Sequence, residues 1–129
     1  MTDFNQQHNR VVWFDLPVVD LERASGFYRA VLACEVAVDS FGDAQFGVLE
    51  HSEGNGGCLV PMGKDGIAGD RGPLLYFNVE GRIRDAVSQV VEHGGEIVQD
   101  VHTIGPHGHR ALVLDSEGNR VALHSMVDA

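Results

Sequence analysis

Hydrophobic positions follow a helical period in two separate segments of the chain, residues 21–32 and 83–91. In each segment the apolar residues recur three or four positions apart, so that they form one stripe along a helix. Asp20 precedes the first segment and is suited to cap its free backbone N–H groups, whereas His93-Gly94-Gly95 ends the second. The pattern therefore predicts two amphipathic helices, whose buried positions are Leu21, Ala24, Tyr28, Val31 and Leu32, and Ile83, Ala86, Val87, Val90 and Val91.

Short runs rich in β-branched and aromatic residues lie before and after these helices and predict strands. We expect the first strand to end before Pro17, which cannot donate to a ladder. The order strand, helix and three further strands then occurs twice along the chain. The predicted strands are 11–16, 35–38, 45–50, 57–60, 74–79, 96–101, 111–114 and 120–125.

The two halves also share short motifs at nearly constant separation. Ser-Glu-Gly-Asn occurs at 52–55 and again at 116–119, and Trp13-Phe14-Asp15-Leu16 is similar to Tyr76-Phe77-Asn78-Val79. The first motif also suits a hairpin turn, because glycine accepts positive φ. Together with the repeated order of elements, these matches predict an internal duplication. We expect one domain over 1–129, with module one at about 10–62, a glycine-rich connector at 63–73 and module two at about 74–126.

Composition narrows the classes of molecule that the protein could bind. The chain has 129 residues with 9 Lys and Arg against 19 Asp and Glu, a formal net charge of −10. Such a charge opposes binding to nucleic acid or to an anionic membrane surface. No apolar run reaches the roughly 18 residues of a membrane span, and two cysteines are too few for a disulfide scaffold. We therefore expect a cytoplasmic protein.

Three motifs resemble the vicinal oxygen chelate superfamily, which includes glyoxalase I, bleomycin-resistance proteins and extradiol dioxygenases. They are residues 16–24 (LPVVDLERA) followed by Phe27-Tyr28, residues 76–79 followed by Gly94-Gly95, and residues 115–125 (DSEGNRVALHS). The resemblance implies an α+β fold in which two tandem β-α-β-β-β modules pair into a curved, cavity-forming mixed sheet. It also implies a homodimer in many cases.

Alternation along the predicted strands separates an apolar face from a mixed one. The apolar face should pack beneath the helices and carries Phe14, Leu16, Leu75, Phe77, Val79, Leu112, Leu114, Val121 and Leu123. The mixed face combines aromatic and polar groups, as a small-molecule pocket requires, although solvent or a dimer partner could cover it instead. The candidate ligand-binding residues on this face are Trp13, Asp15, Cys58, Tyr76, Asn78, His109 and His124.

Two of these candidates have side chains suited to acid–base chemistry. Asp15 beside Trp13 could be partly desolvated, or could form a salt bridge with Arg10 or Arg110. His124 could act as a general base or as a donor to a ligand, or could be a hydrogen-bonded residue at the end of the last strand.

The remaining candidates are more ambiguous. Cys58 fits a small buried hydrophobe better than a nucleophile, because no nearby base is evident. Trp13 and Tyr76 are suited to stack on a flat ligand or to pack in a core.

The resemblance also implies where a metal would bind, because metal-dependent members use His and Glu from the first and last strands of each module. In this sequence these positions hold Trp13, Leu74 (Leu75 or Tyr76 if the register slips), residues 57–60 and Ala122. None is His, Glu or Asp, so we predict no cofactor at the usual site. A rearranged divalent-metal site would have to use His107, His109 and His124.

The sequence thus supports a small-molecule binder with Trp13 and Tyr76 as stacking groups, in which an acidic rim favours a cationic or neutral ligand. The alternative is a glyoxalase-like lyase or isomerase. It would use an atypical metal site or metal-free acid–base chemistry by Asp15 and His124. A third possibility is a regulatory module whose mixed face is buried in an oligomer.

Overall fold

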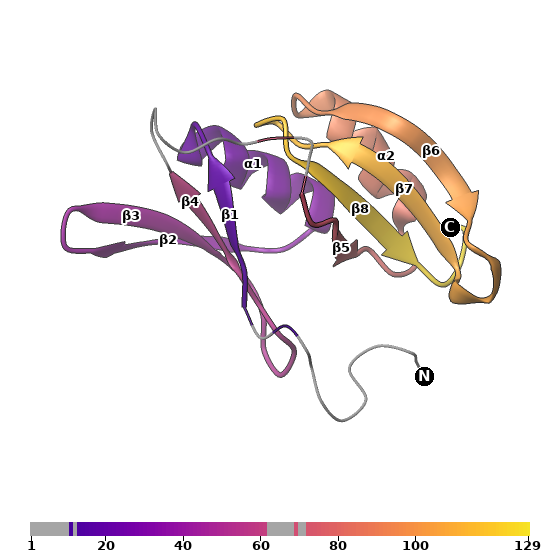
Figure 1. Cartoon of the computed structure of the whole chain (residues 1–129), viewed down its shortest axis with the longest axis horizontal. Helices are drawn as coiled ribbons and strands as arrows, with labels where there is room; N and C mark the ends of the chain where they lie inside the picture. Colours follow the sequence, from indigo (N-terminus) through magenta and orange to yellow (C-terminus); the bar gives the residue numbers. More distant parts are fainter. Residues whose placement is uncertain (1–10, 12, 62–68, 70–71) are drawn as a thin grey trace.

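The computed structural model describes residues 11, 13–61, 69 and 72–129, so that the predicted connector at 63–73 falls largely outside the described residues. Two four-stranded sheets are accompanied by two helices (Figure 1). The elements, in chain order, are β1 (Asp15–Val18), α1 (Leu21–Leu32), β2 (Val36–Phe41), β3 (Ala44–Leu49), β4 (Cys58–Pro61), β5 (Leu75–Asn78), α2 (Ile83–Glu92), β6 (Glu96–Thr103), the short 3₁₀ helix η1 (Gly105–His107), β7 (His109–Leu114) and β8 (Arg120–Ser125).

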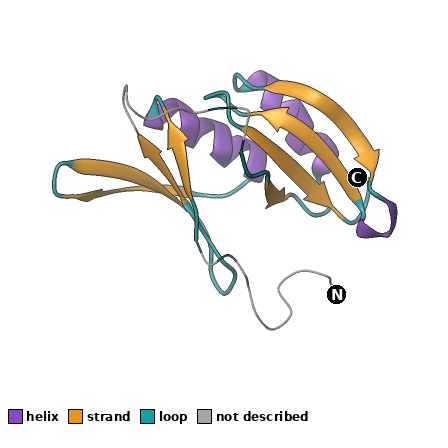
Figure 2. Cartoon of the chain, in the orientation of Figure 1, coloured by secondary structure: helices purple, strands orange, loops and turns teal. Residues whose placement is uncertain are grey.

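The two sheets have the same strand order, as a duplication predicts. The first sheet runs β1-β4-β3-β2 and the second runs β5-β8-β7-β6. In each sheet the first strand of the module pairs in parallel with the last, and the other pairs are antiparallel. Each helix connects the first two strands of its own module (Figure 2). The predicted α+β class with two β-α-β-β-β modules is confirmed.

The first strand corrects the sequence prediction. It spans Asp15–Val18 rather than 11–16, and Pro17 lies inside it, paired with Val60. Because β1 is an edge strand, a proline there need not donate a ladder hydrogen bond on its outer side.

Both helices bury most of the stripe that their sequence spacing predicts. Val91 is the exception: it was expected to be buried but is 61% exposed, because it lies on the outer edge of the stripe on α2. The Asp20 side chain caps α1 by accepting a hydrogen bond from the Arg23 backbone N–H at 3.0 Å. Helix α2 ends at Glu92 with His93 as its C-cap, and the following Gly94 adopts a φ of 92°. Within the described residues, neither helix has the length and apolar content that a bilayer crossing requires.

One hydrophobic core joins the two modules. It contains buried residues of both helices and of strands from both sheets. The Phe14 and Phe77 rings, one from each module, meet edge to face at 5.6 Å, and Tyr28 of α1 packs on Phe77 at 5.4 Å. The helix-facing sides of both sheets therefore turn toward a shared interior, and their opposite sides face outward.

We call these outward sides the open faces, and the strand registers assign their residues. Residues paired across neighbouring strands lie on the same face of a sheet. The first open face carries Asp15, Ala37, Phe46, Val48, Cys58 and Val60. The second open face carries Tyr76, Asn78, His102, Arg110, Leu112, Ala122 and His124.

Strand β7 has the opposite orientation from the one predicted. Ala111 and Val113 are fully buried in the core, paired with Leu123 and Val121 of β8. Leu112, expected in the core, is only half-buried and lies on the open face. The run Ala-Leu-Val-Leu at 111–114 is apolar at every position, so alternation alone could not set its phase.

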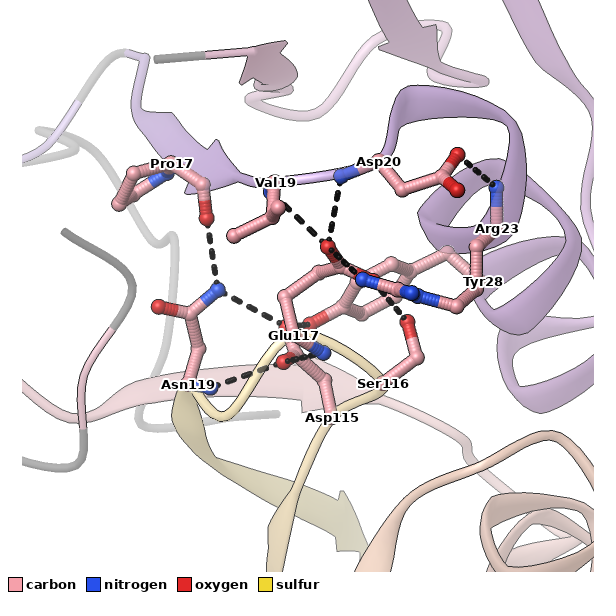
Figure 3. Close-up of polar contacts among 9 residues, drawn as sticks. All are labelled: Pro17, Val19, Asp20, Arg23, Tyr28, Asp115, Ser116, Glu117 and Asn119. Carbon is pink, nitrogen blue, oxygen red and sulfur yellow. Dashed lines mark hydrogen bonds and ion pairs between the residues drawn. The ribbon is translucent and has the colours of Figure 1, made fainter. Parts of the chain in front are cut away.

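A buried polar cluster fastens module two to module one (Figure 3). The side chains of Asp115, Glu117 and Asn119, on the turn between β7 and β8, reach the β1–α1 connection, and we call these three residues the clasp. The Glu117 carboxylate accepts hydrogen bonds from the backbone N–H groups of Val19 at 2.9 Å and Asp20 at 2.8 Å.

Charge and further hydrogen bonds complete the clasp. The Arg23 guanidinium donates to both oxygens of Glu117, at 2.7 and 2.8 Å. The Tyr28 hydroxyl donates to Asp115 at 2.6 Å, and the Asn119 amide donates to the Pro17 carbonyl at 2.8 Å. The clasp therefore contacts both ends of the β1–α1 connection and the buried side of α1.

The clasp changes the acidity of its own groups. Burial would raise the pKa of Glu117, but hydrogen bonds from Arg23, the Asp20 N–H, Ser116 and the Val19 N–H outweigh it and lower the pKa from 4.5 to about 2. Burial, together with the neighbouring Asp115 carboxylate, raises the pKa of Tyr28. The carboxylate form of Glu117 is thus part of the folded state.

The first copy of the Ser-Glu-Gly-Asn motif makes no such clasp. Glu53, the counterpart of Glu117, is exposed. The same Ser-Glu-Gly-Asn sequence therefore forms a bend in module one, and both a turn and part of the clasp in module two.

Replacing the clasp carboxylate tests this difference. We expect Glu117→Gln to lower the free energy of unfolding by about 3 kcal/mol at pH 7, the value of a pKa depressed from 4.5 to about 2. Because the folded-state pKa is the lower one, this stability is fully present above about pH 5 and is lost as the pH falls toward 2. Urea unfolding at several pH values measures it.

The matched control is Glu53→Gln, which removes the same charge from the exposed copy of the motif. We expect it to leave the unfolding free energy nearly unchanged. Equal effects of the two substitutions, or an effect of Glu117→Gln that persists unchanged at pH 2, would contradict the role of the clasp.

Candidate ligand-binding site

The first open face contains a groove of about 720 Å³ lined by residues of module one alone. Two carboxylates, Asp15 and Asp43, face it, and no Lys or Arg is among its lining residues. The lining consists of Asp15, Ser40, Gly42, Asp43, Ala44, Gln45, Phe46, Cys58, Val60 and Pro61. The groove can therefore accept a small organic group, and its charge favours a neutral or cationic one.

Asp15 and Cys58 contact each other on the floor of this groove, because β1 and β4 pair them directly. The Cys58 thiol donates a hydrogen bond to Asp15 Oδ1 at 3.1 Å. Burial raises the pKa of Cys58, and the bond to Asp15 raises it further. A thiol held protonated in this way is a poor nucleophile, so the geometry favours the buried-hydrophobe interpretation of Cys58.

The aromatic candidates are exposed rather than packed in the core. Trp13 is 41% exposed and Tyr76 is 47% exposed. The Trp13 ring meets only the edge of the His51 ring, at 5.4 Å, among the described ring contacts. Both rings therefore keep apolar surface that a flat ligand could cover.

The second open face carries a straight row of polar residues, one from each strand of the sheet. Asn78 of β5 pairs with His124 of β8, His124 pairs with Arg110 of β7, and Arg110 pairs with His102 of β6. We call Asn78, His124, Arg110 and His102 the cross-strand row. Sequence analysis proposed only the first two as site residues.

Arg110 and His102 were missed for a local reason. The strand predicted at 111–114 began one residue too late to include Arg110, and the strand predicted at 96–101 stopped one residue before His102. The signal that could have placed Arg110 on the open face is its position next to Ala111, which is buried on the opposite face of the strand.

His124 and Asn78 each make a local hydrogen bond. His124 Nε2 lies 2.7 Å from the His107 carbonyl oxygen, which can only accept, so this nitrogen carries the proton. Asn78 Oδ1 accepts from the Glu80 N–H at 2.9 Å. The hydrogen-bonded interpretation of His124 therefore fits the structure, and the ring still lies beside Tyr76 at 6.5 Å.

The structure corrects the placement of His109. It pairs with Ser125 and lies on the side of Ala111, so it points away from the open face that carries His124. Its Nδ1 is buried without a hydrogen-bond partner among the described residues. His107, His109 and His124 thus do not converge on one point. Within the described part of the chain, no group of three or more His, Cys, Asp or Glu side chains is arranged to hold a metal ion.

The expected salt bridge of Asp15 is likewise absent from the described residues. Arg110 lies on the other sheet and contacts Tyr76 and His102 instead. Arg10 falls outside the described residues.

Comparison with known sequences gives one match. Residues 10–36, which cover β1 and α1, match the family model described as the bleomycin resistance protein-like N-terminal region. No curated protein matches the chain.

Comparison with solved structures extends the likeness to the whole fold. FosX, the fosfomycin resistance protein of Listeria monocytogenes, superposes with a TM-score of 0.69 at 15% identity over 92% of this chain and 91% of its own. A glyoxalase-related enzyme from Fulvimarina pelagi gives 0.68 at 16% identity, covering 92% and 88%. A glyoxalase/bleomycin resistance protein from Albidiferax ferrireducens gives 0.68 at 17% identity, covering 89% and 97%.

These identities establish a shared architecture and carry no activity with them. The structural matches cover nearly the full length of each protein, and the family match falls on the first strand and helix, where the sequence motif lies. The expected resemblance is therefore confirmed, and the chain has the fold of the vicinal oxygen chelate superfamily.

Proposed function

We propose that the protein binds a small organic molecule between an open face of one copy and an open face of a second copy. The observation that carries this proposal is the shared core. Because both modules pack their helix-facing sides into one interior, their open faces point outward within a single chain. A cavity walled by both sheets therefore needs a second chain.

The ligand contacts follow from the open faces. Trp13 and Tyr76 supply exposed aromatic surface for stacking. Asp15, Asn78 and His124 supply the polar groups that orient the ligand. A cavity of aromatic walls with a few polar groups is typical of small-molecule sites.

Charge favours the pairing of unlike faces in a homodimer. The first open face carries Asp15 and Asp43, and the second carries Arg110. A two-fold axis that places the first face of one copy against the second face of the other would bring opposite charges together, and would do so twice. Such a dimer would contain two equivalent cavities.

The free cysteines Cys34 and Cys58 suit a reducing compartment, and we therefore place the protein in the cytoplasm.

A second candidate is a glyoxalase-like lyase or isomerase. A mutant of FosX was crystallised with manganese(II) and a dihydroxypropylphosphonic acid, which makes metal-assisted chemistry on this fold a specific alternative. In the present chain the positions of the usual ligands hold Trp13, Leu74, one of residues 57–60 and Ala122, and none of these is His, Glu or Asp. We therefore propose binding without the usual chelate as the primary function.

Metal-free acid–base catalysis by Asp15 and His124 would also require a second chain. The two side chains lie on the open faces of different sheets. Asp15 already accepts a hydrogen bond from Cys58, and His124 Nε2 is bonded to the His107 carbonyl.

Removal of the exposed indole tests the stacking role. Benzamide is a neutral flat probe, and NMR titration of the labelled protein measures its affinity. We expect Trp13→Ala to weaken benzamide binding about tenfold, since one aromatic contact is lost together with its buried area. The control is Val91→Ala, which removes an exposed apolar side chain from α2. Unchanged affinity in Trp13→Ala, or no benzamide binding by the unmodified protein, would count against the proposal.

Elemental analysis separates the two candidate functions. For protein purified without chelators, we expect much less than one equivalent of Zn, Mn, Fe or Ni per chain, because the usual ligand positions hold no His, Glu or Asp. A stoichiometric metal that disappears in both His124→Ala and His109→Ala would instead support the atypical metal site of the lyase or isomerase.

A further inference from the structure

Arg110 occupies the middle of the cross-strand row and is fixed there by two neutral groups. Its Nη1 donates to the Tyr76 hydroxyl at 2.8 Å, and its Nε donates to His102 Nε2 at 3.2 Å. His102 Nδ1 lies 2.8 Å from the Asp100 carbonyl oxygen, which can only accept. The imidazole of His102 therefore carries its proton on Nδ1 and presents a lone pair to Arg110.

This arrangement leaves the positive charge of Arg110 without a carboxylate among the described residues. Arg23, Arg82 and Arg84 pair with carboxylates, whereas Arg29 donates to the Val36 carbonyl. In a protein with 19 acidic side chains, a half-buried arginine held by a tyrosine and a histidine is unusual. Its charge is positioned but not neutralised within the described part of the chain.

The guanidinium also keeps donors available. Arginine has five N–H groups in a rigid planar fork. Two of them are used by Tyr76 and His102, which leaves three without a protein acceptor among the described residues. The Tyr76 hydroxyl accepts from Arg110, so its own proton can be donated to another group. These donors gather on the outward side of one sheet.

We propose that the cross-strand row binds the anionic group, a carboxylate or a phosphate, of the ligand that occupies the open faces. The proposal rests on the function proposed above and names the chemical class of its ligand. Arg110 pairs with the anion through its remaining N–H groups, and Tyr76 both donates to the anion and stacks beside it. The acidic groove on the first open face then receives the uncharged or cationic part of the same molecule.

The first sheet shows that the row is not a general property of the fold. Its register places Asp15, Cys58, Val48 and Ala37 in one row across its four strands. Only one of these four is charged, and it is an acid. The cationic row is therefore specific to module two.

A carboxylate from the second copy is the competing occupant, and Asp15 and Asp43 of the first open face are its possible sources. Asp15 Oδ1 already accepts the Cys58 thiol proton. The row also extends across four strands, about 14 Å at the usual strand spacing, so a ligand with an anionic group and an aromatic body would cover more of it than one aspartate side chain does. We therefore favour a free ligand, and the oligomeric state in solution tests the competitor.

Four probes that share a phenyl ring but differ in the charge of the attached group test the proposal. They are benzoate, phenyl phosphate, neutral benzamide and cationic benzylamine, and NMR titration at pH 7 gives each affinity. We expect benzoate and phenyl phosphate to bind about tenfold more tightly than benzamide, as one charge-assisted pair predicts. The anions should shift the imidazole signals of His102 and His124, and their affinity should fall with added salt.

Substitutions of Arg110 connect this preference to the row. We expect Arg110→Gln to reduce the affinity for the two anions to that for benzamide, and to leave benzamide binding unchanged. Arg110→Lys should be intermediate, because the charge remains and the planar fork is lost. The control is Arg84→Gln, which removes an arginine from α2 and should bind all four probes like the unmodified protein.

The outcomes distinguish the two proposals. If benzamide binds but the anions bind no more tightly, or if Arg110→Gln retains the preference for anions, the cross-strand row is not an anion site, although the function proposed above survives. If Arg110→Gln converts a dimer to a monomer, Arg110 is a contact between copies and the anion site is wrong. If none of the four probes binds, both proposals fail.

Discussion

The clasp is the interaction on which the rest of the structure depends. Glu117 is separated from Arg23 by 94 residues along the chain, so its hydrogen bonds join the turn of module two to the first helix of module one. In the folded protein, two backbone N–H groups and the Arg23 guanidinium take the place of the water molecules that would solvate the Glu117 carboxylate in the unfolded chain. That exchange is favourable because every acceptor is matched by a donor. Together with the shared core, the clasp holds the two sheets in the relative position that turns their open faces outward.

Duplication has produced two similar sheets with different chemistry. The second copy of the Ser-Glu-Gly-Asn motif reaches into the other module through Glu117, whereas Glu53, its counterpart in the first copy, is exposed. Likewise, one row across the first open face carries an acid and a thiol, whereas one row across the second carries an arginine between two histidines. The same strand order therefore carries acidic residues on the first open face and a basic residue on the second. These two faces would be complementary in a dimer that pairs unlike faces.

The fold was predictable from the sequence because its signals are local. Helical spacing located both helices, and the repeated order of elements indicated the duplicated architecture. Pro17 was misplaced because an edge strand tolerates proline, which only the sheet order reveals. The phase of β7 was wrong because residues 111–114 are all apolar, and that error carried His109 to the wrong face.

The candidate site was less predictable because it depends on contacts between distant residues. Asp15, Cys58, Tyr76, Asn78 and His124 do lie on the open faces, and Trp13 is exposed just before β1, yet their role in binding stays a prediction. Arg110 and His102 became visible only through the register of three strand pairs. The clasp was likewise hidden, since Glu117 reads as an ordinary turn residue.

The most direct test of this account is an isotope-filtered nuclear Overhauser measurement on an equal mixture of labelled and unlabelled protein, with unmixed labelled protein as the control. The account predicts signals between chains that connect the first open face, around Trp13 and Cys58, with the second, around Tyr76 and Arg110. A protein that remains monomeric at the concentration of the experiment would contradict the completion of the cavity by a second copy. So would contacts between chains that involve only the helices.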